Sequence, residues 1–378
     1  MFQYLFVLGR EPSISTAEIE AVFSVANIKY KIEIKQNNNL VISFDKQINP
    51  QELIIQLGGT IKIAKKINST GNTKEIIIKH IQATQPEGKI QFALTGGDDK
   101  RYGLAIKKEL KALGRSIRYI EIKNTATILH NKLVERQGDI TTIKKLVFIT
   151  EAIQPIEGLS QRDFGRPGSD SKSGMLPPKL AKIMINLAKI DKHSSTLLDP
   201  FCGSGTILSE AAFMGFNNLI GSDISQKAIK DTQTNLEWVK EKESIANLNY
   251  KIILSEASGI DKKINKNNID AIISEPYMGK SLKGNESEKF LIRQAEDLAE
   301  LYIDSFKTFY KILKKSGVII FIIPSFHTQD KWINVDCIEQ IKKLGLTPVP
   351  FSEKYKSLKY WRENQHLARN IWQFKKTI

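Results

Sequence analysis

The sequence has few of the residues that build covalent frameworks or metal sites. Its 378 residues include two cysteines, Cys202 and Cys337, which excludes a disulfide framework and a cysteine-only zinc site. The five histidines are scattered without metal-ligand spacing, so we expect no metal. No apolar run approaches the roughly 20 residues that span a bilayer, and the N-terminus lacks the basic start and cleavage site of a signal peptide. We therefore expect a cytoplasmic protein with no membrane association.

Acidic residues are also scarce relative to basic ones. The chain carries 56 Lys and Arg against 41 Asp and Glu, a net charge of +15. The excess is +8 in residues 1–178 and +7 in the remainder, so it is not confined to a tail. A surplus of charge for solubility would explain this, but a polyanionic partner explains it better.

The hydrophobic patterns divide the chain into four parts. Residues 1–60 alternate strand, helix, strand, strand and helix, which is typical of a small α+β unit. Residues 61–150 form a second small unit, in which Ile76–Ile81 is predicted to be a strand. Residues 151–175 are rich in glycine, serine and charge and are interpreted as a linker. Residues 176–378 alternate strands and helices, which predicts a doubly wound, mostly parallel sheet of about seven strands.

The segment Thr196–Thr206 has the pattern of a nucleotide-binding turn. A short apolar run ends at Asp199, and a helical pattern starts after Gly203 and Gly205. Strand, glycine turn and helix form a crevice at the carboxyl end of the first strand of such a sheet. A dinucleotide fingerprint needs a third glycine, but position 208 is Leu.

Acidic residues follow three successive strands. Asp199 precedes the glycine turn, where it suits an ammonium group better than a pyrophosphate. Asp223 ends the next strand, at the position where an acid accepts ribose hydroxyls. Glu256 follows the third strand and could receive an adenine amine. Together these acids favour S-adenosylmethionine over NAD. Cys202 has no activating base nearby in sequence, so we interpret it as a small residue of the cofactor loop and not as a nucleophile.

The fourth strand of this region ends in Ser274-Glu275-Pro276-Tyr277, which suits chemistry on the amine of a base. An exocyclic amine is a poor nucleophile because its lone pair is delocalised into the ring. An acceptor for its N–H, whether Ser274 Oγ, Glu275 or a backbone carbonyl, would orient the nitrogen towards the methyl group. Tyr277 would stack on the base. We predict that these four residues are catalytic.

This segment resembles the signature of class I amino-methyltransferases, [Asp/Asn/Ser]-Pro-Pro-[Tyr/Phe], with Glu275 in place of the first proline. The register is open, because Glu275-Pro276 could also act as the acid–proline pair. A narrower resemblance is to tRNA guanosine-N2 methyltransferases that modify position 10. It rests on Leu113–Arg118, Ala126–Leu133, Gly174–Ala181, the glycine loop and the tail Tyr360–Arg369.

The resemblance implies a fold, a cofactor and a partner. Residues 1–60 would be a ferredoxin-like domain, residues 61–150 an RNA-binding THUMP domain, and residues 176–378 a Rossmann-like seven-stranded methyltransferase domain. The cofactor would be S-adenosylmethionine, and the partner would be tRNA. The protein would act as a monomer or with a small helper subunit.

The resemblance and the loop pattern together define the predicted binding residues. Those expected to contact the cofactor are Leu176, Pro177, Asp199, Pro200, Cys202, Gly203, Gly205, Thr206, Asp223, Ile224, Glu256 and Ala257. Basic clusters in the second unit, the linker and the tail are expected to contact RNA: Lys107, Lys108, Lys111, Arg115, Arg118, Arg162, Arg166, Arg362 and Arg369. For Arg162 and Arg166, a plain hinge is the alternative. Methylation of amines in DNA or rRNA and non-catalytic RNA binding remain alternative functions.

Overall fold

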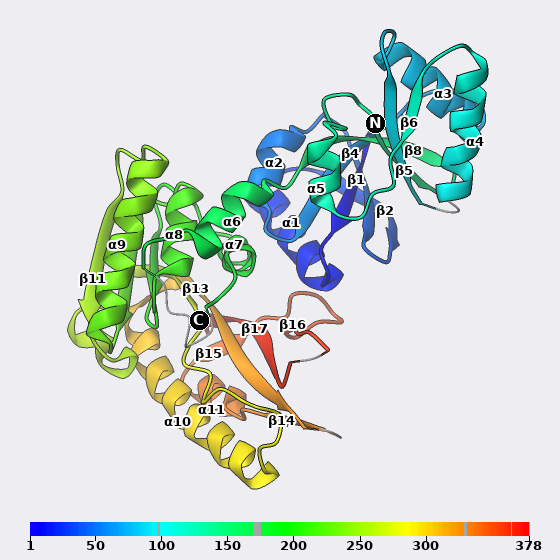
Figure 1. The fold of residues 1–378 in the computed structure, drawn as a ribbon. Helices are drawn as coiled ribbons and strands as arrows, with labels where there is room; N and C mark the ends of the chain where they lie inside the picture. The colour runs from blue at the N-terminus through cyan, green and yellow to red at the C-terminus, as the bar shows by residue number, and fades with distance from the viewer. Residues whose placement is uncertain (97–98, 169–174, 329–330, 364, 378) are drawn as a thin grey trace. The chain divides into compact units, whose positions relative to one another are not determined.

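The computed structural model describes residues 1–96, 99–168, 175–328, 331–363 and 365–377 (Figure 1). They form two compact units, one of residues 1–16 and 28–157 and one of residues 17–27 and 158–378. Part of the predicted linker, including Gly174, lies outside the described residues. Within them, none of the helices combines the length and the apolar character needed to cross a bilayer.

The first unit is built on one eight-stranded sheet, in the order β2-β3-β1-β4-β8-β7-β5-β6. Its strands are β1 (Phe2–Leu8), β2 (Tyr30–Gln36), β3 (Asn39–Phe44), β4 (Thr60–Lys66), β5 (Ile90–Thr95), β6 (Ile117–Tyr119), β7 (Asp139–Ile143) and β8 (Leu146–Ile153). Its helices are α2 (Pro50–Gln56), α3 (Thr73–Thr84), α4 (Asp99–Ala112) and α5 (Thr125–His130), and α1 (Pro12–Val25) begins in it.

The first four strands have the ferredoxin-like order that the sequence predicts. The chain runs β1-α1-β2-β3-α2-β4, and the sheet order is β4-β1-β3-β2. The predicted boundary at residue 60 lies at the start of β4, which pairs with β1 and with β8. One sheet therefore runs through both predicted N-terminal parts. The assignment of the second part as a THUMP domain stays a prediction.

The strand predicted at Ile76–Ile81 is wrong, because these residues lie in α3. Asn72 and Glu75 form a capping box that starts the helix. The isoleucines that favour a strand by propensity are instead buried on the helix, in a cluster with Phe92. Packing has overridden the β propensity of the run.

The second unit contains the predicted doubly wound sheet. The path of the sheet is β11-β10-β9-β12-β13-β17-β15, with β14 paired to β13 and β16 paired to β17. Its strands are β9 (Thr196–Asp199), β10 (Asn218–Asp223), β11 (Asn249–Leu254), β12 (Ile269–Ser274), β13 (Leu313–His327), β14 (Trp332–Asn334), β15 (Leu346–Pro348), β16 (Leu358–Tyr360) and β17 (Leu367–Lys376). The strands from β9 to β13 are parallel, and β17 runs antiparallel between β13 and β15.

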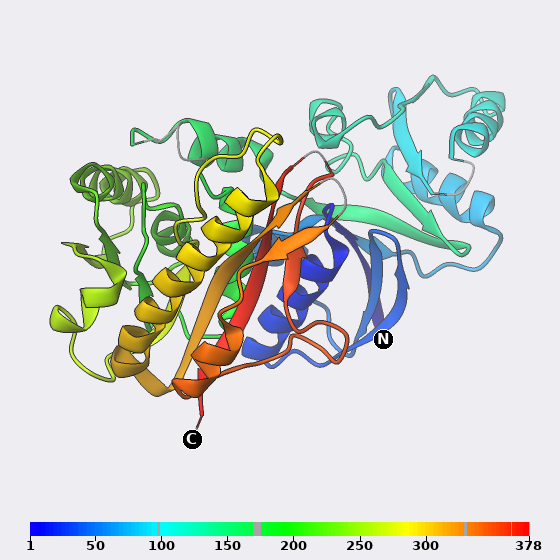
Figure 2. The same cartoon turned by 90° about the horizontal axis from the view of Figure 1, so that it is seen from below.

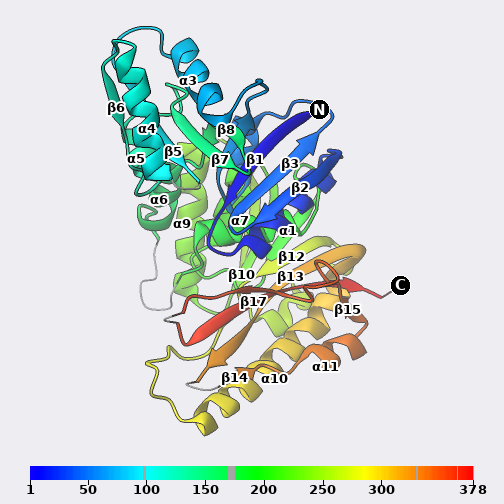
Figure 3. The same ribbon diagram turned by 90° about the vertical axis from the view of Figure 1, so that its right-hand side faces the viewer.

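Helices cover both faces of this sheet. They are α6 (Ile156–Phe164), α7 (Pro178–Leu187), α8 (Thr206–Phe213), α9 (Gln226–Lys242), η1 (Ala257–Lys262), α10 (Glu288–Ile312) and α11 (Ile338–Lys343). Figure 3 shows α7 on one side of β13 and β17, with α10 and α11 on the other. Figure 2 shows α10 running along β13, which it contacts. The chain order reverses on either side of β9, so the carboxyl ends of β9, β10 and β12 open onto one crevice.

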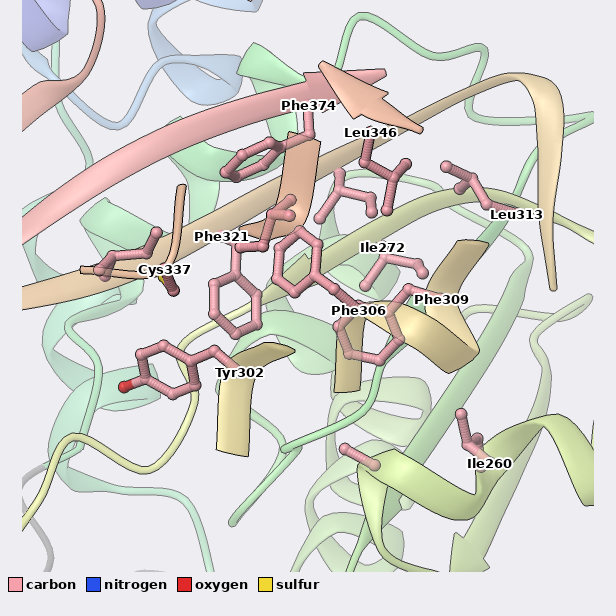
Figure 4. Packing of buried hydrophobic residues seen from close by; sticks show 14 of the residues in the cluster. Ile260, Ile272, Tyr302, Phe306, Phe309, Leu313, Phe321, Cys337, Leu346 and Phe374 are labelled. Carbon is pink, nitrogen blue, oxygen red and sulfur yellow. The ribbon is translucent and has the colours of Figure 1, made fainter. Parts of the chain in front are cut away.

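An aromatic core holds α10 against the sheet. Phe306 packs edge-on against Phe321 of β13 and Phe374 of β17, with ring centroids 5.1 Å apart in both pairs (Figure 4). Tyr302 also packs edge-on against Phe321, and its hydroxyl donates a 2.7 Å hydrogen bond to the backbone oxygen of Tyr277. The core therefore anchors the backbone of the segment that follows β12.

Candidate active site

A cavity of about 1190 Å³ lies at the carboxyl ends of β9, β10 and β12. Most of the predicted cofactor and catalytic residues line it: Leu176, Asp199, Pro200, Cys202, Gly203, Thr206, Asp223, Ile224, Glu256, Ala257, Glu275, Pro276 and Tyr277. Pro177 and Gly205 do not line it. Pro177 is the N-cap of α7, and Gly205 is the N-cap of α8.

The loop between β9 and α8 is held in place by α9. Thr232 Oγ1 donates a 2.7 Å hydrogen bond to the carbonyl of Gly203, and Asn235 Nδ2 donates one of 2.7 Å to the carbonyl of Ser204. Gly203 and Gly205 have φ angles of +52° and +82°, in the left-handed region. The loop thereby exposes the backbone of Gly203 to the cavity without a side chain in between.

The two loop glycines predict different responses to substitution. A Cβ at Gly205 would lie 2.9 Å from Thr232 Cγ2, whereas a Cβ at Gly203 meets no atom within 4 Å. We expect Gly205→Ala to lower the free energy of unfolding by about 2 kcal/mol or more, because left-handed strain of about 1–2 kcal/mol adds to the steric contact. Gly203→Ala should lose only the strain, about 1 kcal/mol. Urea unfolding of both variants measures the difference, and equal losses would contradict the geometry.

Asp199 is a buried carboxylate with one oxygen available to a ligand. Ser274 Oγ donates a 2.6 Å hydrogen bond to Asp199 Oδ1, and the Phe201 N–H donates one of 3.2 Å to the same oxygen. The pKa of Asp199 is raised to about 7, chiefly by burial and also by the nearby carboxylates of Asp223 and Glu275, while the hydrogen bonds from Ser274 and Phe201 oppose the rise. A cation bound at Oδ2 would offset this unfavourable burial of charge.

Asp223 and Glu256 line the cavity on the side of β10 and β11. The N–H groups of Gly203 and Ser225 donate hydrogen bonds of 3.0 and 2.9 Å to the two oxygens of Asp223. Each carboxylate oxygen has a second lone-pair site, so Asp223 can still accept hydrogen bonds from a ligand. Burial raises the pKa of the Cys202 thiol well above its usual range, which fits a packing role for this residue.

At the end of β12, the side chains of Ser274 and Glu275 have different surroundings. Ser274 is fully buried, and its hydroxyl is bonded to Asp199. The prediction that Ser274 meets the target amine is therefore wrong. Glu275 lines the cavity instead, and its Oε1 accepts a 2.5 Å hydrogen bond from Arg369 Nε. Burial raises the pKa of Glu275, and the Arg369 charge opposes that rise.

Tyr277 presents its side chain to the cavity. It is 55% exposed, although its backbone oxygen is fixed by Tyr302. The next residues, Met278 to Leu282, also line the cavity, and the Lys280 N–H is held by Gln294 Oε1 at 2.9 Å. An exposed aromatic ring on a fixed backbone is suited to stacking a planar group.

The residues predicted to contact RNA fall into two groups. Lys108, Lys111, Arg118 and Arg362 are exposed, and Lys107 is half-buried, so their role stays a prediction. Arg115 donates hydrogen bonds to two backbone carbonyls, those of Gln85 and Gly88.

The other three arginines have partners inside the second unit. Arg162 is buried and pairs with Glu210 at 2.7 Å. Arg166 is buried and donates a 2.6 Å hydrogen bond to Thr206 Oγ1. The prediction that these two side chains bind RNA phosphates is corrected for this reason. Arg369 is committed to Glu275 and lines the cavity, so it is not a surface phosphate contact.

Sequence reasoning missed several residues of the cavity. Among them are Met175, Lys227, Gln365 and His366. Gln365 and His366 precede β17, which pairs with β13, and this brings the tail to the carboxyl end of the sheet. Spacing in the sequence carries no signal for such a contact. Lys227 lies four residues after Asp223 in the sequence, so the prediction that Asp223 binds the cofactor could have indicated Lys227 as well.

Comparison with known proteins identifies the family. A family model for the RMKL-like methyltransferase domain matches residues 168–345. The tRNA (guanine(10)-N2)-dimethyltransferase of Methanothermobacter thermautotrophicus is 36% identical over 148 residues, 37% of this chain and 38% of that protein. The probable tRNA (guanine(10)-N2)-dimethyltransferase of Methanothermococcus thermolithotrophicus is 34% identical over 145 residues, 38% of this chain and 78% of that sequence. The chain belongs to the tRNA guanine-N2 methyltransferase family.

The family resemblance predicted from the sequence is thus confirmed. The match covers 38% of the length of the Methanothermobacter relative. The crystal structure of TrmN from Thermus thermophilus aligns over 99% of both chains, with a TM-score of 0.57 and 14% identity. The α/β fold predicted for the whole chain, with its methyltransferase sheet, is confirmed by this alignment.

Proposed function

We propose that this member of the family transfers a methyl group from S-adenosylmethionine to the N2 amine of a guanosine in tRNA, at position 10. The observation that carries the proposal is the placement of two kinds of group in one cavity. Asp199 and Asp223 flank the glycine loop, and Glu275 and Tyr277 lie at the end of β12. The first pair suits the cofactor, and the second pair suits a base.

The residues of the loop fit S-adenosylmethionine. Asp199 Oδ2 would hold the methionine ammonium, Asp223 the ribose hydroxyls and Glu256 the adenine amine. When bound, the cofactor supplies a methyl group on a positively charged sulfur. The fit rests on the chemistry of the donor set, since a buried carboxylate with raised pKa at Asp199 calls for a cation.

Glu275 would orient the guanine amine. Its Oε1 accepts a hydrogen bond from Arg369, and Glu275 lines the cavity, so Oε2 would be the oxygen that accepts an N–H of the amine. That hydrogen bond localises the nitrogen lone pair and fixes its direction. On accepting the methyl group, N2 would gain positive charge, and Glu275 Oε2 would take up the proton that N2 loses.

Tyr277 would stack on the guanine. Removing its ring should therefore lower the activity, whereas removing only its hydroxyl should not. We expect Tyr277→Ala to lower kcat/KM for RNA roughly 5- to 150-fold, because base–aromatic stacking contributes about 1–3 kcal/mol. Tyr277→Phe keeps the ring and should retain most of the activity. Steady-state methylation assays of both variants test this. A loss as large in Phe as in Ala would point to the hydroxyl and contradict stacking.

The choice of acceptor tests the proposed function. The protein is incubated with cofactor labelled in the methyl group and with an unmodified tRNA transcript or a DNA duplex of the same length. We expect label in the tRNA alone. Label in the duplex at an equal rate would favour a DNA amino-methyltransferase. Label in neither would refute the proposal, provided that calorimetry shows the protein to be folded and binding the cofactor.

A further inference from the structure

Arg369 and Glu275 form an ion pair in the wall of the cavity. Arg369 Nε donates a 2.5 Å hydrogen bond to Glu275 Oε1, and the two side chains are 14% and 13% exposed. Both residues line the cavity. Within the part of the chain that the structure describes, the Arg369 side chain has no other hydrogen bond or ion pair. A guanidinium carries five N–H donors, so the terminal nitrogens of Arg369 can still donate to a ligand.

The strand that carries Arg369 is paired on both sides at this residue. Arg369 lies opposite Pro324 of β13 and opposite Tyr360 of β16. The next side chain, Asn370, donates a 3.0 Å hydrogen bond to the carbonyl of Ile323. A functional side chain on a paired strand is held more precisely than one on a loop. The position of the guanidinium beside Glu275 is therefore set by the sheet.

The polar groups of the pair match the edge of guanine that carries N2. Glu275 supplies two acceptors, Oε2 and the remaining lone pair of Oε1, and the guanidinium supplies donors next to Oε1. Guanine presents hydrogens on N2 and N1 and an acceptor at O6, in that order along one edge. In adenine and cytosine, the ring nitrogen beside the amine carries no hydrogen, so its lone pair would meet a carboxylate oxygen. The pair thus favours guanine and disfavours the other bases that have an amine.

We propose that Arg369 is a specificity-determining residue, whose guanidinium donates a hydrogen bond to O6 of the target guanine while Glu275 accepts from N2 and N1. The inference rests on the proposed function, since it adds a contact to the same base. It gives Arg369 a role beyond holding Glu275, because the contact to O6 selects the base and does not move its proton.

The test changes the atom at position 6 of the target base alone. Two tRNA transcripts carry guanosine or 6-thioguanosine at position 10; sulfur is the weaker acceptor, and N2 and N1 keep their hydrogens. We expect kcat/KM of the wild-type chain to be about 10-fold or more higher for guanosine, as for a hydrogen bond to a charged group. In Arg369→Met the two values should agree within about twofold, because the partner of that atom is gone. A purely structural role would lower both values equally and keep their ratio.

Two further variants complete the test. Arg369→Lys keeps a positive charge beside Glu275 but lacks the fork that bridges two acceptors, so it should also lose most of the preference. Arg362→Met removes an exposed arginine of the same tail and should leave the preference unchanged. Equal kcat/KM for the two transcripts in the wild-type chain would overturn the inference and leave the proposed function standing. So would a wild-type preference that persists in both Arg369 variants. A wild-type chain that methylates neither transcript would overturn the proposed function, and the inference with it.

Discussion

Glu275→Gln is expected to lower kcat for methyl transfer at least about 100-fold, the range of general acid–base contributions. The amide keeps the size of the side chain, but it cannot accept the proton that leaves N2. It also lacks the negative charge of the carboxylate, which would orient the amine. Binding of the cofactor should change little, because the proposed partner of Glu275 is the base and not the cofactor. Single-turnover assays and calorimetry measure the two quantities separately.

A surface variant provides the matched control for this result. Glu288 pairs with Lys331 at 2.6 Å, and the two side chains are 52% and 56% exposed. Glu288→Gln removes one carboxylate of the same unit and should leave kcat unchanged. If Glu275→Gln retains more than about half of wild-type kcat, then Glu275 is not the amine acceptor, since general acid–base groups contribute 10²–10⁴-fold. A backbone carbonyl would then be the remaining acceptor.

Asp199→Asn is expected to weaken the binding of S-adenosylmethionine about 30-fold or more, because losing one partner of a buried charge pair costs about 2–5 kcal/mol. The hydrogen bonds that Asp199 accepts from Ser274 and Phe201 both go to Oδ1, so the asparagine Oδ1 can retain them. Calorimetry measures the affinity. Thermal unfolding of the unliganded variant should show equal or higher stability, since burial disfavours the charged carboxylate.

The same carboxylate predicts a dependence on pH. Burial raises the pKa of Asp199 to about 7 in the unliganded protein, with Asp223 and Glu275 as the charged neighbours. Below that pH the carboxyl is protonated and cannot pair with an ammonium, so affinity should fall as the pH drops from 8 to 6. In Asp199→Asn this fall should disappear. A wild-type affinity that is flat across this range would contradict the assignment of Asp199.

The acidic residues of the site that follow successive strands could be predicted from the sequence. Asp199, Asp223 and Glu256 each follow an apolar run, and parallel strands bring their carboxyl ends to one edge. The register at β12 was not accessible in this way. Whether Ser274 or Glu275 faces the cavity depends on where the strand ends and on which side chain Asp199 takes as a partner.

Contacts between distant segments explain the other errors. Arg369 meets Glu275 because β17 inserts antiparallel beside β13, and no local pattern reports that pairing. Arg162 and Arg166 lie in a glycine-rich, charged stretch that is typical of a solvent-exposed linker. Their burial depends on Glu210 and Thr206 of α8, which only the fold brings to them.

The central claim is that the acceptor is the N2 amine of one guanosine, and removing that amine tests it most directly. Two tRNA transcripts are compared, one with guanosine at position 10 and one with inosine, which lacks only the N2 amine. Methylated nucleosides are then identified by mass spectrometry. The account predicts N2-methylated guanosine in the first transcript and no methyl transfer to the second. Equal methylation of the two transcripts would contradict it.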